Sequence, residues 1–218
     1  MMVPPLPTAE ASQEALEKAP AIAAIPKLDP IPDALEVAVL LKIGSDISTD
    51  DIMPAGARVR PWCSNIPRTS EFTFEPVDET YPARATAAGK EGHGHAIVAG
   101  NNYGQGSSRE NAALAPRYLG LRIVLARSFA RIHWQNLVNF GVLPLTFADP
   151  ADYDRIGRDD MLSLTGIHAA QRAGPDITAG LTSSARTIAL HHTLSARQLD
   201  LLLAGGVINW LRERLVAA

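Results

Sequence analysis

The sequence has little cysteine: Cys63 is the single one among 218 residues. One thiol excludes a disulfide within the chain. It also excludes an iron–sulfur cluster held by this chain alone, because such clusters are usually held by four cysteine thiolates. The first residues have neither a basic n-region nor an Arg-rich amphipathic pattern. Together with the scarcity of cysteine, this favours a cytoplasmic protein.

Long apolar runs and an excess of one charge are also missing. No apolar run approaches the roughly 20 residues that a membrane-spanning helix needs. The 20 Lys and Arg residues are scattered and the net charge is −3, so there is no basic patch of the kind that binds nucleic acid. We therefore expect neither a membrane nor a nucleic acid among the partners.

Proline is concentrated at the start of the chain. Residues 1–34 hold seven of the 16 prolines, a density that stops helices and favours extended chain. We expect a proline-rich linker or tail over 1–34, with one short helix around 11–19. A tail without consequence and a tether left from a larger polypeptide both fit this composition. Residues 35–218 are expected to form one globular domain, since 46% of the chain is hydrophobic and 20% is charged.

The middle of this domain alternates between short apolar runs and helical patterns. Strands are expected at 36–44, 95–100, 121–127 and 142–147, and helices from Ser107 or Ser108 to about Tyr118 and at 129–141. A strand–helix–strand–helix–strand order requires parallel pairing with right-handed crossovers. The sequence thus predicts an α/β fold with a mainly parallel sheet core flanked by helices.

The pattern is less regular on either side of this unit. Residues 58–91 contain four prolines and are predicted to form an irregular surface excursion. Later in the chain we expect a helix at 149–157 capped by Asp149, strands at 160–166 and 187–194, and a terminal helix kinked or broken at Gly205 and Gly206.

The segment GNNYGQGSSRE is the most informative one for chemistry. Gly104 and Gly106 allow a sharp turn with positive φ, after which a helix is expected to begin at Ser107 or Ser108. A helix start presents unpaired N–H groups and partial positive charge, and the Arg109 guanidinium can grip a carboxylate or phosphate. The pattern predicts a small-anion site.

The same arrangement suggests a base. A serine hydroxyl removes a proton only when its alkoxide is stabilised, and a helix start beside an arginine offers that stabilisation. The alternative is that Ser107 and Ser108 cap a helix while Arg109 makes a structural salt bridge. A dinucleotide site is disfavoured, because GQGSSR lacks the third glycine.

Two neighbouring acidic residues follow the first predicted strand. Asp50 and Asp51 in STDDIMPAG could act as a general acid or hold a metal. The alternative is that both satisfy backbone donors within their own turn.

Two histidines in GHGHA have the spacing of a metal clip. No third ligand is near His93 and His95 in the sequence, so exposed loop histidines are the expectation.

Four motifs together carry a family resemblance. STDDIMPAG, GNNYGQGSSRENAALAPRYLG, SFARIHWQNLVNFGVLPLTF and ADPADYDRI resemble, in order and separation, the C-terminal domain of the aconitase family between about residues 35 and 164. That family includes aconitases, homoaconitases and isopropylmalate isomerases. The resemblance implies a swivelling β/β/α domain of the aconitase/isopropylmalate isomerase small-subunit type.

The resemblance also implies roles for four residues. Ser107 would be the catalytic base that removes and returns a proton next to a carboxylate. Ser108 and Arg109 would bind substrate carboxylate, and Asp50 would line the site from the opposite loop.

A partner is implied as well. In the family, the [4Fe-4S] cluster lies on other domains, so this chain is expected to bind no cofactor and to act with a cluster-bearing large subunit or domains. The implied reaction is dehydration and rehydration of a hydroxy-polycarboxylate of the citrate/isocitrate type. An isopropylmalate- or homocitrate-type isomerase and a non-catalytic anion-binding module of the same fold stay open as alternatives.

The chain departs from the family pattern at two places. Trp62 and Cys63 stand where related sequences carry a substrate-binding arginine before SNIP, and Arg58 or Arg60 would have to take its place. Asn111 stands where many aconitases have histidine. These departures leave the identity of the hydroxy-acid open.

Overall fold

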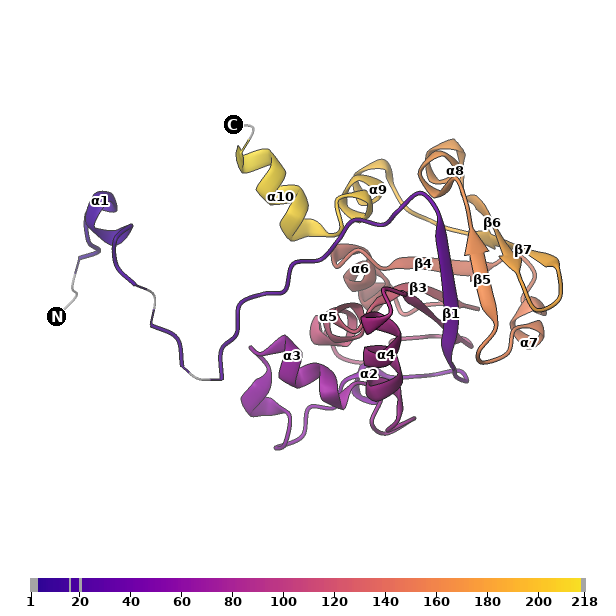
Figure 1. Ribbon diagram of the computed structural model, residues 1–218, viewed down its shortest axis with the longest axis horizontal. Helices are drawn as coiled ribbons and strands as arrows, with labels where there is room; N and C mark the ends of the chain where they lie inside the picture. The colour runs from indigo at the N-terminus through magenta and orange to yellow at the C-terminus, as the bar shows by residue number, and fades with distance from the viewer. Residues whose placement is uncertain (1–3, 16, 20, 217–218) are drawn as a thin grey trace.

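A computed structural model describes residues 4–15, 17–19 and 21–216 of the chain. The body is a layer of helices against a closed barrel of strands, and the N-terminal segment approaches it from one side (Figure 1).

Seven strands form the barrel in the order β1-β2-β3-β4-β7-β6-β5, and β5 pairs with β1 to close it. The bounds are β1 Leu35–Lys42, β2 His95–Ala99, β3 Leu121–Ala126, β4 Leu143–Phe147, β5 Met161–Leu164, β6 Asp176–Leu181 and β7 Arg186–His191. The first four strands are parallel neighbours. The sequence pattern predicted this parallel pairing for three of them, β2, β3 and β4.

The expected mainly parallel core is replaced by this mixed barrel. The pairs β4·β7, β7·β6, β6·β5 and β5·β1 are antiparallel. For β6 and β7 the reason is their connection, a turn of only four residues, 182–185. So short a connection joins antiparallel strands, whereas parallel strands need a crossover of a dozen or more residues.

The central strands are buried on both faces. In β3, Ile123 and Leu125 point into the barrel, and Val124 between them packs in the cluster beneath the helices. A strand with two buried faces has no polar alternation. This is why LRIVLA and HAIVA are nearly continuous apolar runs.

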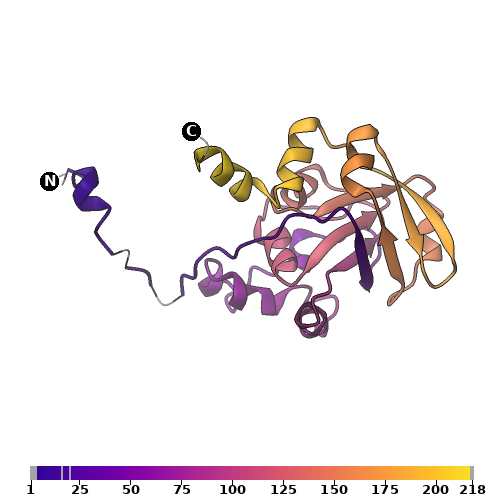
Figure 2. The same cartoon turned by 45° about the horizontal axis from the view of Figure 1, so that its top comes forward.

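Helices connect and cover the strands (Figure 2). Helix α5 (Asn111–Tyr118) joins β2 to β3, and α6 (Arg131–Asn139) joins β3 to β4. The others are α1 Thr8–Ala11, α2 Thr49–Ile52, α3 Ile66–Thr69, α4 Tyr81–Lys90, α7 Asp152–Arg155, α8 Ile167–Ala173, α9 Ala196–Leu203 and α10 Val207–Val216, with 3-10 turns at Arg60–Trp62 and Ser70–Phe72.

Several predicted elements need correction. The 58–91 region is mostly helical turns and contains α4, because its Pro82 lies in the first turn, where proline is tolerated. Asp149 does not cap a helix: its Oδ1 accepts from the Ala151 N–H at 2.9 Å in the turn before α7. The expected break of the terminal helix at Gly205 and Gly206, by contrast, is confirmed: the two residues have φ of 84° and 123° and separate α9 from α10.

The two GHGHA histidines lie in different environments. His93 is exposed, but His95 begins β2 and is fully buried, which corrects the expectation of two exposed loop residues. Its Nε2 lies 2.6 Å from the Tyr81 hydroxyl. Burial, together with the charges of Arg84, Arg122 and Arg117, lowers the pKa of His95 to about 3, so the ring is neutral at neutral pH.

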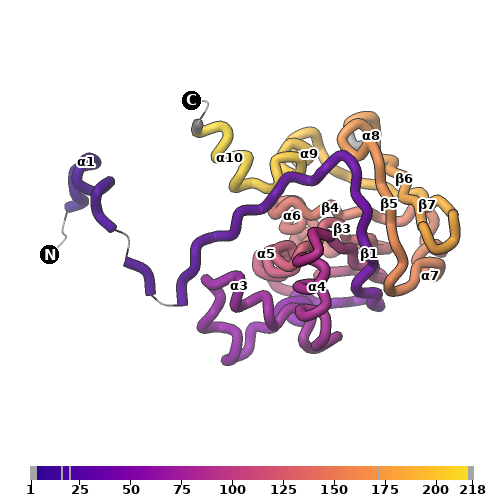
Figure 3. Tube along the Cα trace, viewed as in Figure 1, coloured from indigo at the N-terminus to yellow at the C-terminus, as the bar shows by residue number. Residues whose placement is uncertain are grey.

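The N-terminal segment runs alongside the helices before entering β1 (Figure 3). Leu28 and Ile31 are buried, and the Asn209 side chain donates a hydrogen bond to the Leu28 carbonyl at 2.6 Å. Its last residues therefore pack against the body, while residues 4–15 lie away from it (Figure 1). A linker boundary at residue 34 stays a prediction.

The contact between α6 and the α9–α10 break yields the first testable prediction. Gly141 has φ of +73°, and a Cβ there would lie 2.7 Å from the Gly205 backbone. We expect Gly141→Ala to lower the free energy of unfolding by about 2–4 kcal/mol, because it adds backbone strain and overpacking. Gly44→Ala is the control, since a Cβ at Gly44 meets nothing within 4 Å. Equal denaturation midpoints for the two variants would contradict this account.

Candidate active site

The loops after β1 and β2 are joined by backbone hydrogen bonds. Because β1 and β2 are parallel neighbours, their carboxyl ends meet at one edge of the barrel. The Gly104 N–H donates to the Ile47 carbonyl at 2.7 Å, and the Thr49 N–H donates to the Gln105 carbonyl at 2.8 Å. The STDD and GSSR motifs, more than fifty residues apart, are thereby brought together.

Gly104 is required at this junction. Its φ is +81°, and a Cβ there would lie 2.2 Å from the ring of His133. His133 is buried on α6, so the glycine lets the loop lie directly on that helix.

The two aspartates of the acidic turn have different partners. Asp51 belongs to a capping box: its Oδ2 accepts from the Ser48 N–H at 2.8 Å, and its own N–H donates to Ser48 Oγ at 3.1 Å. Asp50 forms an ion pair with Arg109 across the two loops. The expectation of purely local bonding therefore holds for Asp51 alone.

Arg109 is the most constrained of the predicted site residues. Its Nη1 donates to the Asp50 carboxylate and, at 3.2 Å, to the Met53 carbonyl. The Arg109 side chain is 24% exposed. Its guanidinium is thus fixed by α2 and remains partly open to solvent.

The serines lie in the loop before α5. Both Ser107 and Ser108 are exposed, and the Thr49 hydroxyl donates to the Ser107 carbonyl at 3.0 Å. The prediction that the helix begins at these serines is wrong, because α5 begins at Asn111. The physical reason is that the Ser107 carbonyl accepts from Thr49 across the loops, and the first helical bonds go to the carbonyls of Arg109 and Glu110.

A cleft of about 470 Å³ opens beside these loops. We call it the motif cleft; it is lined by Met53, Pro54, Ala55, Val59, Arg60, Cys63, Thr69, Ser108, Arg109, Glu110 and Asn111. The structure thus brings Ser108 and Arg109 together with Arg60. Ser107, which immediately precedes Ser108 in the chain, does not line this cleft.

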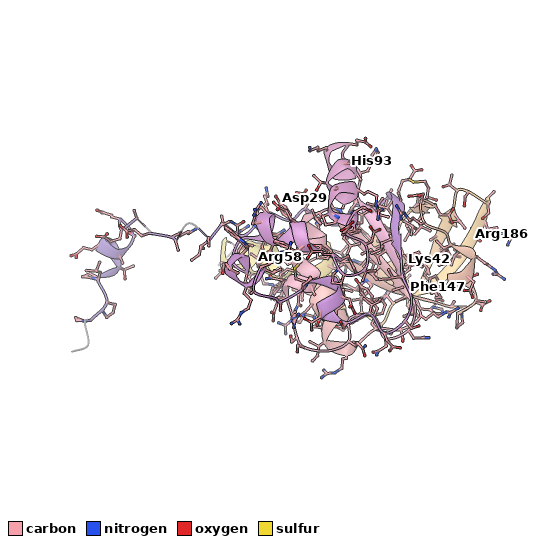
Figure 4. All side chains as sticks on the ribbon, turned by 90° about the horizontal axis from the view of Figure 1, so that it is seen from below. Asp29, Lys42, Arg58, His93, Phe147 and Arg186 are labelled. Carbon is pink, nitrogen blue, oxygen red and sulfur yellow. The ribbon has the colours of Figure 1, made fainter. Side chains whose placement is uncertain are left out.

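The two candidate arginines at 58 and 60 are placed differently. Arg58 pairs with Glu75 at 3.1 Å, packs over the Phe72 ring and has a side chain that is 74% exposed. Figure 4 labels it in the part of the body nearest the N-terminal segment. Arg60 lines the motif cleft. Sequence reasoning could not separate the two, because the difference comes from the 3-10 turn at Arg60–Trp62.

The two departures from the family pattern are in contact. The Asn111 amide donates to the Cys63 carbonyl at 3.1 Å. This bond ties the start of α5 to the turn that carries Arg60. No signal within either motif alone indicates it.

The described residues do not fit a metal cluster. Nowhere among them do three or more His, Cys, Asp or Glu side chains gather in a way that could hold a metal. Cys63 is a single thiol, and a [4Fe-4S] cluster needs several.

Comparisons with known proteins agree on the family. The model of the aconitase C-terminal domain matches residues 73–150. A putative mitochondrial aconitate hydratase of Emericella nidulans is 38% identical over 85% of this chain and 26% of its own length. The mitochondrial homocitrate dehydratase of Saccharomyces cerevisiae is 35% identical over 81% of this chain and 25% of its own length.

A solved structure extends the agreement to the fold. The 3-isopropylmalate dehydratase of Methanocaldococcus jannaschii is 28% identical, with a TM-score of 0.68, over 84% of this chain and 96% of its own. The chain belongs to the aconitase family of hydro-lyases and represents its C-terminal domain. It spans about a quarter of the length of the curated relatives named above.

The cytoplasmic expectation is contradicted by these comparisons. Relatives from Emericella nidulans, Aspergillus fumigatus, Dictyostelium discoideum and Gracilaria gracilis are all named mitochondrial. A single cysteine and the lack of an evident export or transit signal were insufficient grounds for expecting a cytoplasmic protein. Separately, no helix in the described part of the chain is both long and apolar enough to cross a membrane.

The division of labour between the two aspartates can be tested. We expect Asp51→Ala to lower the free energy of unfolding by about 1 kcal/mol, the usual cost of a lost cap. Asp50→Ala should change it by less than about 0.5 kcal/mol, because the Asp50 side chain is 62% exposed and exposed ion pairs contribute little. Urea denaturation of both variants measures the difference, and a larger loss for Asp50→Ala would refute the assignment.

Proposed function

We propose that this domain supplies a serine base and an arginine clamp to a hydro-lyase of the citrate/isocitrate type. A cluster-bearing set of partner domains or a large subunit would complete the active site. The observation that carries the proposal is the Asp50–Arg109 ion pair, because it fixes a guanidinium at a cleft that Ser108 also lines, directly after the exposed Ser107 in the chain.

Ser107 is assigned the proton transfer. Its Oγ, as the alkoxide, removes a proton from the carbon next to a substrate carboxylate and becomes a neutral hydroxyl. The substrate hydroxyl on the adjacent carbon takes a proton from an acid on the partner domains and leaves as water, and a carbon–carbon double bond forms. Hydration reverses these steps. Arg109 stabilises the negative charge that develops on the oxygens of serine and carboxylate, as fixed donors do in a site closed to water.

Asp50 is assigned a positioning role. Its carboxylate holds the Arg109 guanidinium from the opposite loop. Arg109 keeps donors for a substrate carboxylate, since its hydrogen bonds to the described residues engage Nη1 alone. Ser108 lines the same cleft and adds a hydroxyl donor.

The choice of substrate is assigned to Arg60. A tricarboxylate needs one more cationic partner than a dicarboxylate, and Arg60 lines the motif cleft, whereas Arg58 is held by Glu75. The relatives act on different acids by name, including homocitrate and 3-isopropylmalate. A homocitrate- or isopropylmalate-type activity is therefore the second candidate, and it would use the same serine.

Removal of the base is the first test. The chain, combined with a cluster-bearing aconitase large fragment, is assayed by the absorbance of cis-aconitate. We expect Ser107→Ala to lower kcat by roughly 10²–10⁴-fold, the usual contribution of a positioned base. Ser184→Ala, in the exposed turn between β6 and β7, should leave kcat unchanged. Unchanged turnover in Ser107→Ala would defeat the mechanism, and no turnover in the wild type would favour a non-catalytic anion-binding module.

Exchange of the two arginines tests the substrate assignment. We expect Arg60→Gln to raise KM for citrate roughly ten- to hundredfold, the effect of one lost charge-assisted hydrogen bond. Arg58→Gln is the matched control and should leave KM unchanged. With a dicarboxylate substrate such as isopropylmalate, Arg60→Gln should have little effect on KM. A larger rise in KM for citrate in Arg58→Gln than in Arg60→Gln would assign the third carboxylate to Arg58.

A further inference from the structure

A second cleft lies at the opposite ends of the parallel strands. We call it the arginine cleft; its volume is about 500 Å³, and it is formed by the segment 26–29, the C-terminal ends of α4 and α5, and the residues around the starts of β2 and β3. The motif cleft adjoins loops at the carboxyl ends of β1 and β2, so the two clefts share no lining residue. Figure 4 labels Asp29 and His93 on this side of the molecule.

Two arginines in this cleft form no close ion pair with a carboxylate of the described residues, although the charge of Asp29 acts on both from farther away. Arg117 is 4% exposed; its Nη2 donates to the Asp29 carbonyl at 2.7 Å, and its Nε is buried without a hydrogen-bond partner. Arg122 Nη1 donates to the same carbonyl at 3.2 Å. Neither guanidinium forms an ion pair with any described carboxylate. Buried charges in proteins are normally paired, because an isolated charge is costly to desolvate.

The surroundings hold the arginines close together. Burial and the neighbouring charge of Arg122 lower the pKa of Arg117 to about 9. Gly94 makes room for Arg122, because a Cβ at that position would lie 2.6 Å from Arg122 Cγ. The two like charges are therefore brought to one carbonyl oxygen by the shape of the cleft.

The net charge of the cleft is positive. Lys27 and Lys90 join the two arginines in its lining, and Asp29 is its single acidic residue. The C-terminal ends of α4 and α5 contribute about half a negative charge each. Roughly two positive charges remain after these are counted, which is the charge that a small dianion would neutralise.

We propose that the arginine cleft binds a small anion with at least two negative charges, carried on phosphate or carboxylate groups. The ligand would accept hydrogen bonds from the donors of Arg122 other than Nη1 and would offset the charge of the buried Arg117. The site is independent of the proposed catalytic role of Ser107.

The test is titration of the full 218-residue chain with inorganic phosphate and, separately, with citrate at constant ionic strength. Backbone amide shifts measured by NMR report each cleft: Gly94 and Gly120 for the arginine cleft, Gly106 and Ser108 for the motif cleft. We expect saturable shifts at Gly94 and Gly120 with at least one of the two anions. Saturation with phosphate alone would identify a phosphate ligand, and saturation with citrate alone a carboxylate one.

The variants distinguish a built site from general attraction. We expect Arg122→Gln to weaken binding roughly ten- to hundredfold. Lys90→Gln changes an exposed residue and should weaken it about two- to fivefold. Arg186 is an exposed arginine at the far end of the molecule (Figure 4). Arg186→Gln removes the same charge and should leave the affinity for the anion unchanged.

Three outcomes would overturn the proposal. The first is the absence of saturable shifts at Gly94 and Gly120 with both anions. The second is an equal loss of affinity in Arg122→Gln and Arg186→Gln. The third is saturation in Asp29→Asn but not in the wild type, which would make the Asp29 carboxylate the natural occupant of the cleft.

Discussion

The Asp50–Arg109 ion pair is the contact on which the candidate active site depends. As an exposed pair it contributes about 0–1 kcal/mol to stability, so its value lies in position rather than in energy. The backbone bonds from Gly104 to Ile47 and from Thr49 to Gln105 carry the join between the loops. The ion pair then fixes the direction of the Arg109 guanidinium on two loops that these backbone bonds already hold together.

Local sequence patterns were sufficient to predict the part of the fold that carries these two loops. The apolar runs at 95–100, 121–127 and 142–147, with helices between them, predicted the parallel β2–β3–β4 unit, which the structure confirms. The GSSR and STDD motifs follow β2 and β1, and the carboxyl ends of adjacent parallel strands meet by necessity. The closing of the barrel depended on long-range pairing between β5 and β1, which no local pattern contains.

The finer geometry of the site could not be read from the sequence for a similar reason. Whether α5 begins at Ser107 or at Asn111 depends on which group the Ser107 carbonyl meets, and that group, the Thr49 hydroxyl, is 58 residues away. The Asn111–Cys63 bond shows the same dependence. It joins Asn111 to Cys63, the two places where the motifs are expected to depart from the family pattern, and both residues line the motif cleft.

The strand β2 connects the two clefts physically. It begins at the buried His95 and ends at Ala99, just before the loop that carries Ser107. A charged His95 would add a third buried cation beside Arg117 and Arg122, and burial together with the charges of three arginines holds its pKa at about 3 instead. The neutral ring binds the Tyr81 hydroxyl and leaves the positive charge of the arginine cleft on guanidinium groups. Guanidinium groups keep their charge where an imidazole loses it, so the start of β2 stays packed while the surface beside it remains cationic.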